Sequence, residues 1–317
     1  MLVVIAIGGK ALLGPGTGLE ADAHRAGARS AVAAIAEVAR HHQVVVTHGS
    51  APQVGLLAYQ SALSREVTEY PLDIVEAEAQ GFLGYLLQQE LQNELRDRNV
   101  ATMLTQVQVD PETPGFDRRR KLVGPVLAPV DADRMRRDRG WEFEATGRGF
   151  RRSVPSPEPL AIVELETIRL LASAGALVVC AGGGGIPVRC DADGALHGVE
   201  AVIDKDRSAA LLASLLGADL LLYLTDVPAV SHDWGSAFAR PIERISPAEL
   251  ALHHFDEATI GPKVQSACRF VRLTGKRAAI GAVTDAEAVC AGRAGTQVVA
   301  EEFDPAVLSG VPGAGAR

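Results

Sequence analysis

The 317 residues are enough for two ordinary domains or for one large α/β unit. With 39 acidic against 31 basic side chains, the formal net charge is −8, and 4% of the residues are aromatic. This composition disfavours general nucleic-acid binding, which needs a basic face and usually stacking rings, but it allows small anionic ligands. We expect neither a signal peptide nor a membrane span, because the longest apolar runs fall short of about 20 residues. Four widely spaced cysteines favour reduced thiols in a cytoplasmic protein.

Short apolar runs typical of buried strands alternate along the chain with stretches of helical period. The strand-like runs are residues 2–7, 44–47, 101–107, 176–180, 220–224 and 278–280. The helical stretches are residues 26–40, 77–96, 159–173, 208–216 and 265–273. Because the strands are apolar throughout, this order predicts a mainly parallel sheet covered by helices on both faces. In such folds the ligand site lies at the carboxyl ends of the strands.

Residues 110–159 interrupt this alternation. They carry seven prolines and two basic clusters, at 118–121 and 134–139. The segment is too long for an ordinary loop, and Trp141 and Phe143 offer apolar surface for packing. We predict one α/β domain over residues 1–317 with 110–159 as an inserted protrusion or lid. The alternative is a disordered basic excursion.

Three of the predicted strands run into glycine-rich turns. The turn residues are Gly8 and Gly9, then Gly49 with Ser50 and Ala51, and finally Gly182, Gly183 and Gly184. Glycine lets backbone N–H groups converge on an anion without a Cβ in the way. One such turn is more often a tight connection, but three at one sheet edge predict a phosphate site. No Walker-type P-loop and no G-x-G-x-x-G motif occurs in the sequence.

Lysines stand at the starts of two predicted helices. Lys205 lies between Asp204 and Asp206, and Lys263 precedes residues 265–273. The acidic residues could simply cap the helix, but a lysine there opposes the helix dipole, so an anionic partner is expected. Lys121, in the inserted segment, is a third candidate. Phosphoryl transfer needs such cations on converging loops, and Asp206 could orient a lysine or help to hold Mg²⁺.

In order along the chain, these motifs closely resemble those of carbamate kinases, which belong to the amino acid kinase superfamily. The matching segments are Gly8-Gly9 with Ala11-Leu12, then 52–55, 123–125, 149–157, 182–188, 204–206, 224–227 and 261–264. The resemblance implies a three-layer α/β/α sandwich with a small protruding subdomain, and a homodimer in arginine metabolism. It also implies reversible phosphoryl transfer between ATP and carbamate through carbamoyl phosphate, with ATP/ADP and Mg²⁺ as cofactors.

The resemblance further implies roles for individual residues. Lys205 and Lys263 would stabilise the transferred phosphoryl group, Asp206 would organise them, and Lys121 would reach in from the protrusion. The glycine turns would supply backbone donors to the phosphate. The residues expected to flank the nucleotide, besides the two helix-start lysines, are Thr225, Asp226, Val227, Gly261 and Pro262.

The sequence departs from the carbamate kinase pattern at the predicted acceptor site. Lys10 stands where the family has Asn, and Ser50-Ala51 stand where it has Asn-Gly. The charge of Lys10 could assist phosphoryl transfer or recognise a more acidic acceptor. Around Lys121, the sequence Arg119-Arg120-Lys121-Leu122 stands in place of the family's Pro-Thr-Lys-Pro pattern.

Three hypotheses follow from these motifs and departures. The first is a carbamate kinase that works toward ATP. The second is a kinase of the same fold that acts on another small carboxylate or phosphonate. The third is a catalytically silent nucleotide-binding protein, and the retention of Lys205, Asp206 and Lys263 argues against it.

Overall fold

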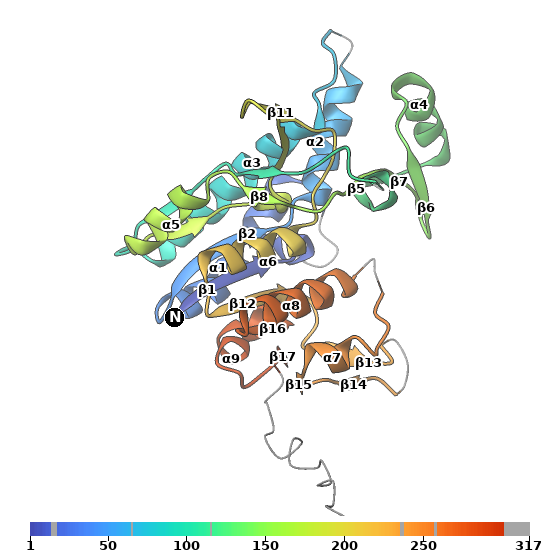
Figure 1. Cartoon of the computed structure of the whole chain (residues 1–317). Helices are drawn as coiled ribbons and strands as arrows, with labels where there is room; N and C mark the ends of the chain where they lie inside the picture. Colours follow the sequence, from blue (N-terminus) through green and yellow to red (C-terminus); the bar gives the residue numbers. More distant parts are fainter. Residues whose placement is uncertain (14–17, 65, 115, 235–237, 257–258, 301–317) are drawn as a thin grey trace, which may run out of the picture.

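An eight-stranded sheet forms the centre of the molecule (Figure 1). The computed structural model describes residues 1–13, 18–64, 66–114, 116–234, 238–256 and 259–300, except for the side chain of Lys10. Its strands follow the order β15-β17-β16-β12-β1-β2-β9-β3. Their bounds are β1 (Leu2–Ile7), β2 (Gln43–His48), β3 (Val100–Thr102), β9 (Leu177–Val179), β12 (Leu220–Thr225), β15 (Arg244–Ile245), β16 (Arg277–Ala282) and β17 (Thr296–Val298).

The pairing of the central strands brings their carboxyl ends to one level. All neighbouring pairs in this sheet are parallel except β16 with β17. Ile7, the last residue of β1, pairs with Leu224 of β12 on one side and His48 of β2 on the other. The turns that follow these strands therefore lie side by side, as the sequence predicted.

Helices cover both faces of the sheet. One face packs against α1 (Ala21–Ala39), α3 (Leu72–Glu94) and α9 (Ala286–Cys290), and the other against α5 (Leu165–Ser173), α6 (Lys205–Leu216) and α8 (Gly261–Thr274). Alternate residues of β1 enter opposite cores, Val4 toward α6 and Val3 toward α1. This three-layer sandwich confirms the predicted fold class. None of the described helices is long and apolar enough to cross a membrane.

A second sheet changes two predicted elements. Its order is β11-β10-β4-β8, with β4 (Gln106–Gln108), β8 (Ala161–Ile162), β10 (Ile186–Cys190) and β11 (Leu196–Gly198). The single strand expected over 101–107 is therefore two strands in different sheets. It breaks at the buried Thr105, whose N–H donates to Gln80 Oε1 (2.9 Å) on α3. The helix expected over 159–173 begins only at Leu165, because β8 pairs with β4 first.

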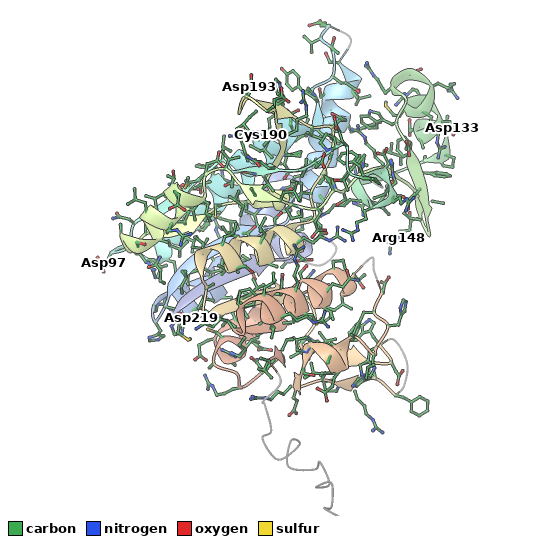
Figure 2. The ribbon with its side chains drawn as sticks, in the orientation of Figure 1. Asp97, Asp133, Arg148, Cys190, Asp193 and Asp219 are labelled. Carbon is green, nitrogen blue, oxygen red and sulfur yellow. The ribbon has the colours of Figure 1, made fainter. Side chains whose placement is uncertain are left out.

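The segment from β5 to β7 projects from the body of the molecule. It comprises β5 (Arg120–Leu127), α4 (Pro129–Arg139), β6 (Phe143–Thr146) and β7 (Gly149–Pro155), and its strands form a separate sheet in the order β5-β7-β6. Asp133 on α4 and Arg148 beside β7 lie at its outer ends (Figure 2). Val123 and Trp141 join it to Val54 on α2 (Ala51–Leu63) in a small third core.

The remaining elements are short. They are η1 (Gly9–Leu12), η2 (Phe116–Arg118), η3 (Gly182–Gly184), β13 (Ser231–His232), β14 (Arg240–Pro241), α7 (Pro247–Leu250) and η4 (Val283–Asp285). Two of them, η1 and η3, are separated from the ends of β1 and β9 by one and two residues, and they contain glycines of two of the three predicted turns.

Candidate active site

Asp204 caps the N-terminus of α6. The Asp204 carboxylate accepts hydrogen bonds from the N–H groups of Asp206 (2.9 Å) and Arg207 (3.4 Å), so this residue is the N-cap of the helix. The predicted capping role of an acidic residue is therefore real. It belongs to Asp204, however, and leaves the side chains of Lys205 and Asp206 for other contacts.

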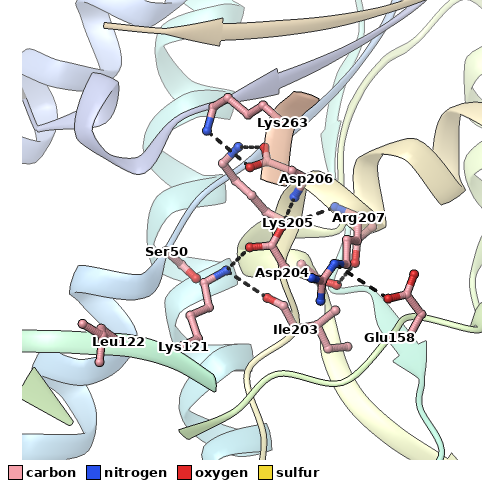
Figure 3. Close-up of polar contacts among 12 residues, drawn as sticks. Ser50, Lys121, Leu122, Glu158, Ile203, Asp204, Lys205, Asp206, Arg207 and Lys263 are labelled. Atoms are coloured by element: carbon pink, nitrogen blue, oxygen red, sulfur yellow. Dashed lines mark hydrogen bonds and ion pairs between the residues drawn. The ribbon is translucent and has the colours of Figure 1, made fainter. Parts of the chain in front are cut away.

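Asp206 holds two lysines from two helices (Figure 3). Its Oδ1 accepts from Lys205 Nζ, and its Oδ2 accepts from Lys263 Nζ at 3.3 Å. Lys263 lies in the first turn of α8, so both ammonium groups stand at helix N-termini. All three side chains are buried. The cluster thus concentrates more positive than negative charge in a place where the helix dipoles also favour an anion.

Burial controls the charge of Lys205. It lowers the pKa of Lys205 to about 8, against the opposing effect of the Asp206 carboxylate and with a smaller lowering by Lys263. A negatively charged ligand beside Nζ would favour the protonated form of Lys205. The site is therefore best completed by an anion.

Lys121 reaches the same cluster from the protrusion. Its Nζ donates to the carbonyl oxygen of Ile203 and to Asp204 Oδ2, both at 3.2 Å. Burial by itself raises the pKa of Asp204, but Lys121 and Lys205 outweigh it and hold that pKa well below its usual range. The carboxylate that caps α6 therefore also anchors the lysine of β5.

The predicted glycine donors divide into two groups. The N–H groups of Gly8 and Gly49 donate to the carbonyls of Leu224 and Ile7, both at 3.0 Å, and so they extend the sheet instead of facing a ligand. In the part of the chain that the structure describes, the N–H groups of Gly9, Gly182 and Gly183 donate to no other residue. These three glycines are thus the ones with donors to offer an anion.

Gly49 contributes space instead of a donor. A Cβ on Gly49 would lie 2.8 Å from the nitrogen of Gly9 and 3.2 Å from Cδ of Lys205. Only glycine lets these two turns and the lysine stem meet so closely. Lys10 follows in η1, and its side chain lies outside the described part of the structure.

Ala181 directs the chain into the glycine run. It has a left-handed backbone (φ 48°), which is uncommon for a residue with a Cβ. Two threonines hold it there: its N–H donates to Thr105 Oγ1 (3.0 Å), and its carbonyl accepts from Thr47 Oγ1 (2.8 Å). Hydrogen bonds at both its N–H and its carbonyl thus hold the backbone of Ala181 in the conformation that leads into Gly182.

Ser50 precedes α2 without capping it through a side-chain hydrogen bond. Its Oγ donates instead to Glu76 Oε1 (2.7 Å), and both residues are buried. Glu76 was not among the predicted site residues, although a glutamate among the buried positions Val75, Ala79 and Leu83 of α3 is a detectable signal. Tyr223 was not predicted either; its hydroxyl donates to the carbonyl of Asp206 (2.8 Å) and links β12 to α6.

The residues expected at the nucleotide lie on two connections beside the lysine cluster. Thr225 ends β12, and its Oγ1 donates to Asp226 Oδ1 (3.0 Å), with Val227 next in the chain. Gly261 and Pro262 begin α8, where the Gly261 N–H donates to the carbonyl of Asp256 (2.9 Å). Tyr223 and Lys263 link these two connections to Asp206.

Parallel strands that end in glycine turns, with lysines at helix N-termini beside them, define a fold and site suited to phosphoryl transfer. A sequence profile of the Amino acid kinase family matches residues 1–281. The chain belongs to this family.

Within the family, the chain is similar to carbamate kinases over nearly its whole length. It is 45% identical over 306 residues to the carbamate kinase of Rhizobium meliloti (strain 1021), covering 96% of this chain and 94% of that protein. It is 43% identical over 299 residues to that of Haemophilus influenzae, covering 94% and 96%. The structure of carbamate kinase from Giardia lamblia bound to AMP-PNP has a TM-score of 0.86 and 35% identity, covering 95% of this chain and 98% of that one.

Proposed function

We propose that this protein is a carbamate kinase that forms ATP and carbamate from carbamoyl phosphate and ADP. The observation that carries the proposal is the buried Lys205–Asp206–Lys263 cluster at the N-termini of α6 and α8. The similarity to carbamate kinases from several organisms supports the same activity.

In this reaction a terminal phosphate oxygen of ADP attacks the phosphorus of carbamoyl phosphate. The bond between phosphorus and the carbamoyl oxygen breaks, and carbamate leaves with that oxygen. Negative charge spreads over the three equatorial oxygens of the transferred group, where cations stabilise it. Lys205 and Lys263 are the proposed cations, and Asp206 holds their ammonium groups in place.

Other residues complete the proposed site. Lys121 would bind the phosphorylated acceptor from the protrusion, and the N–H groups of Gly182 and Gly183 would donate to the phosphoryl group. We place Lys10 on the acceptor side, because it directly follows Gly9. Thr225 to Val227 and Gly261-Pro262 would flank the nucleotide. The segment 110–159 is proposed to act as an inserted lid.

The side chains of the site fit an Mg²⁺ ion that is bound mainly by the nucleotide phosphates, and not by a group of protein ligands. Among the described residues no three His, Cys, Asp or Glu side chains gather into a metal-binding group. Both carboxylates of the cluster, Asp204 and Asp206, accept from lysines instead. Mg²⁺ in kinases is held largely by substrate phosphates and water, so such a cage is not needed. When bound, the ion would neutralise phosphate charge.

We also propose a cytoplasmic homodimer with a role in arginine metabolism. Strand β3 is an edge of the central sheet, and Tyr85 and Leu104 leave about half of their surface exposed beside it. Gln88, Gln89, Gln92 and Asn93 line the same surface. An open strand edge beside a surface that mixes exposed Tyr and Leu with amide side chains suits pairing with a second copy. Light scattering on the purified protein should give twice the mass of one chain, and a monomer at micromolar concentration would contradict the dimer.

The test of the activity is ATP formation by purified protein from carbamoyl phosphate, ADP and Mg²⁺, followed with a coupled assay. The matched negative control is Lys205→Met, which removes the ammonium group from the cluster. ATP formation above this control supports the proposal. Equal rates for the two proteins would contradict it.

One observation favours a second candidate, a kinase of another small carboxylate or phosphonate. Ser50 and the buried Glu76 occupy the proposed acceptor side, where the carbamate kinase pattern has Asn at position 50. The discriminating variant is Lys10→Asn with Ser50→Asn. It should raise activity with carbamate if the acceptor has changed, and it should leave all activities unchanged if the substitutions are neutral.

A further inference from the structure

Glu76 is a buried carboxyl group that the lysine cluster does not use. It is fully buried on α3, and its Oε1 accepts from the hydroxyl of Ser50. Its Oε2 finds no hydrogen-bond partner among the described residues. A buried, unsatisfied carboxyl oxygen is costly and uncommon in folded proteins, so its retention calls for a reason.

The carboxyl group stands behind the glycine turn of the site. A Cβ on Gly183 would lie 1.4 Å from Glu76 Oε1 and 2.3 Å from Ser50 Oγ. On the other side of Ser50, Gly49 contacts Gly9 and the stem of Lys205. The Ser50–Glu76 pair therefore adjoins both the turn at Gly183, which the proposed function assigns to the phosphoryl group, and the turn at Gly9, which leads to Lys10 on the proposed acceptor side.

The protonation of Glu76 determines what Ser50 can offer a ligand. A serine hydroxyl has one proton and two lone pairs. When Glu76 is ionised, it takes that proton in a hydrogen bond, and Ser50 Oγ can only accept from a ligand. When Glu76 is protonated, its own O–H can donate to Ser50 Oγ, and the serine proton becomes available to a ligand oxygen.

We propose that Ser50 and Glu76 form a specificity-determining pair, in which ionised Glu76 keeps Ser50 Oγ as an acceptor for an N–H of the carbamoyl group. This inference rests on the proposed function. A site that accepts an N–H rejects analogues without one, because its buried oxygen is then left unpaired. Acetyl phosphate, which has a methyl group in place of the amino group, is the analogue that such a pair disfavours.

Burial makes the protonation of Glu76 responsive near neutral pH. Burial raises the pKa of Glu76 to about 7, while the Ser50 hydrogen bond and Lys121 on β5 oppose the rise. His48 on β2 stays neutral, because burial lowers its pKa to about 4. From α6, Asp204 is ionised and paired with Lys121, and Lys205 adds positive charge. The ionised fraction of Glu76 therefore rises with pH through this range.

The test compares carbamoyl phosphate with acetyl phosphate as phosphoryl donors to ADP. The readout is the ratio of their kcat/KM values from about pH 6 to about pH 8, on either side of the Glu76 pKa. In the wild type this ratio should rise several-fold with pH, up to about tenfold, the usual effect of one hydrogen bond. Ser50→Ala should lower the ratio to a constant, small value through a higher KM for carbamoyl phosphate.

Glu76→Gln separates a role in selectivity from a merely structural one. The Gln carbonyl can accept the Ser50 proton at every pH, so the ratio should stay high and lose its pH dependence. The matched control is Ser153→Ala, which removes another serine–glutamate hydrogen bond, to Glu144 in the protrusion. This control should keep the wild-type ratio and pH profile. Thermal unfolding of each variant checks that it is folded.

The outcomes separate this inference from the proposed function. If the wild type forms ATP but Ser50→Ala and Glu76→Gln both retain its ratio and its pH profile, the specificity role is overturned and the carbamate kinase proposal stands. If the wild type forms no ATP from carbamoyl phosphate, the proposed function itself fails, and the inference fails with it.

Discussion

The central sheet and the protruding sheet are held together by different forces. In β1, every residue from Val3 to Ile7 is fully buried, and helices pack on both faces of the sheet. In β6 of the protrusion, by contrast, no residue is fully buried, and the guanidinium groups of Arg136 and Arg152 lie over the rings of Phe143 and Trp141. Apolar burial stabilises more per residue than such cation–π contacts. We therefore expect charges on the body to be held more rigidly than charges on the protrusion.

The proposed site draws on both regions. Lys205 and Lys263 come from helices packed on the central sheet, whereas Lys121 comes from the protruding sheet and is partly exposed. This contrast predicts that the body lysines carry the chemistry and that Lys121 contributes mainly to binding. The variants below test that division.

The largest effect is expected for Lys205→Met. Loss of a buried ammonium group at the transferred phosphoryl group should reduce kcat by about 10³-fold, the upper end for one electrostatic stabiliser. Coupled ATP formation measures the change. Lys276→Met is the control, because Lys276 pairs with Asp219 on the surface and should leave kcat unchanged. A loss in kcat of less than tenfold for Lys205→Met would show that Lys205 does not stabilise the transferred phosphoryl group.

The alkaline pH profile tests the same lysine without a change of shape. Lys205 is charged below its pKa of about 8 and loses its proton as the pH rises through that value. The kcat/KM for carbamoyl phosphate should therefore fall about tenfold per pH unit above this pKa, where Glu76 is already ionised. A profile with no fall between about pH 8 and about pH 10 would show that the charge of Lys205 is not required.

Lys121→Met should have a smaller effect that appears in binding. The variant loses the contacts of Nζ with Asp204 and Ile203 and the charge that we assign to the acceptor. We expect KM for carbamoyl phosphate to rise about tenfold with kcat nearly unchanged, the signature of lost uniform binding. Steady-state kinetics give both constants. An equal loss in kcat and kcat/KM would show that Lys121 acts in the chemical step, and would contradict the proposal that only the body lysines do so.

The smallest effect is expected inside the protrusion itself. Arg152 lies 3.8 Å from the ring centre of Trp141 and pairs with Glu200 at 3.3 Å. Arg152→Leu should lower the free energy of unfolding by roughly 1 kcal/mol, as measured by urea denaturation. The kcat should change by less than about twofold, since no step of the proposed reaction uses this residue. A loss of kcat without a loss of stability would contradict this assignment.

Local sequence signals predicted the sandwich and much of the charged cluster. Apolar runs followed by glycines identify strand ends such as Ile7–Gly8, and the pattern Asp204-Lys205-Asp206 marks a helix start. Ser50 and Glu76 are 26 residues apart in the chain, and no residue pattern near Ser50 indicates that Glu76 is its hydrogen-bond partner. The division of residues 101–107 between two sheets depends on Gln80, which only the folded chain brings to Thr105. The proposed roles of the site residues remain predictions for the experiments above.

Ala181 has a consequence for how the site meets its ligand. A fifth consecutive glycine at this position would relieve its left-handed backbone, which costs an alanine roughly 1 kcal/mol. It would also give the unfolded chain more conformations to lose on folding, a cost of similar size. With alanine the turn has fewer alternative conformations. At the proposed site, a phosphate would therefore meet the N–H groups of Gly182 and Gly183 already oriented, and less of its binding free energy would be lost in ordering the loop.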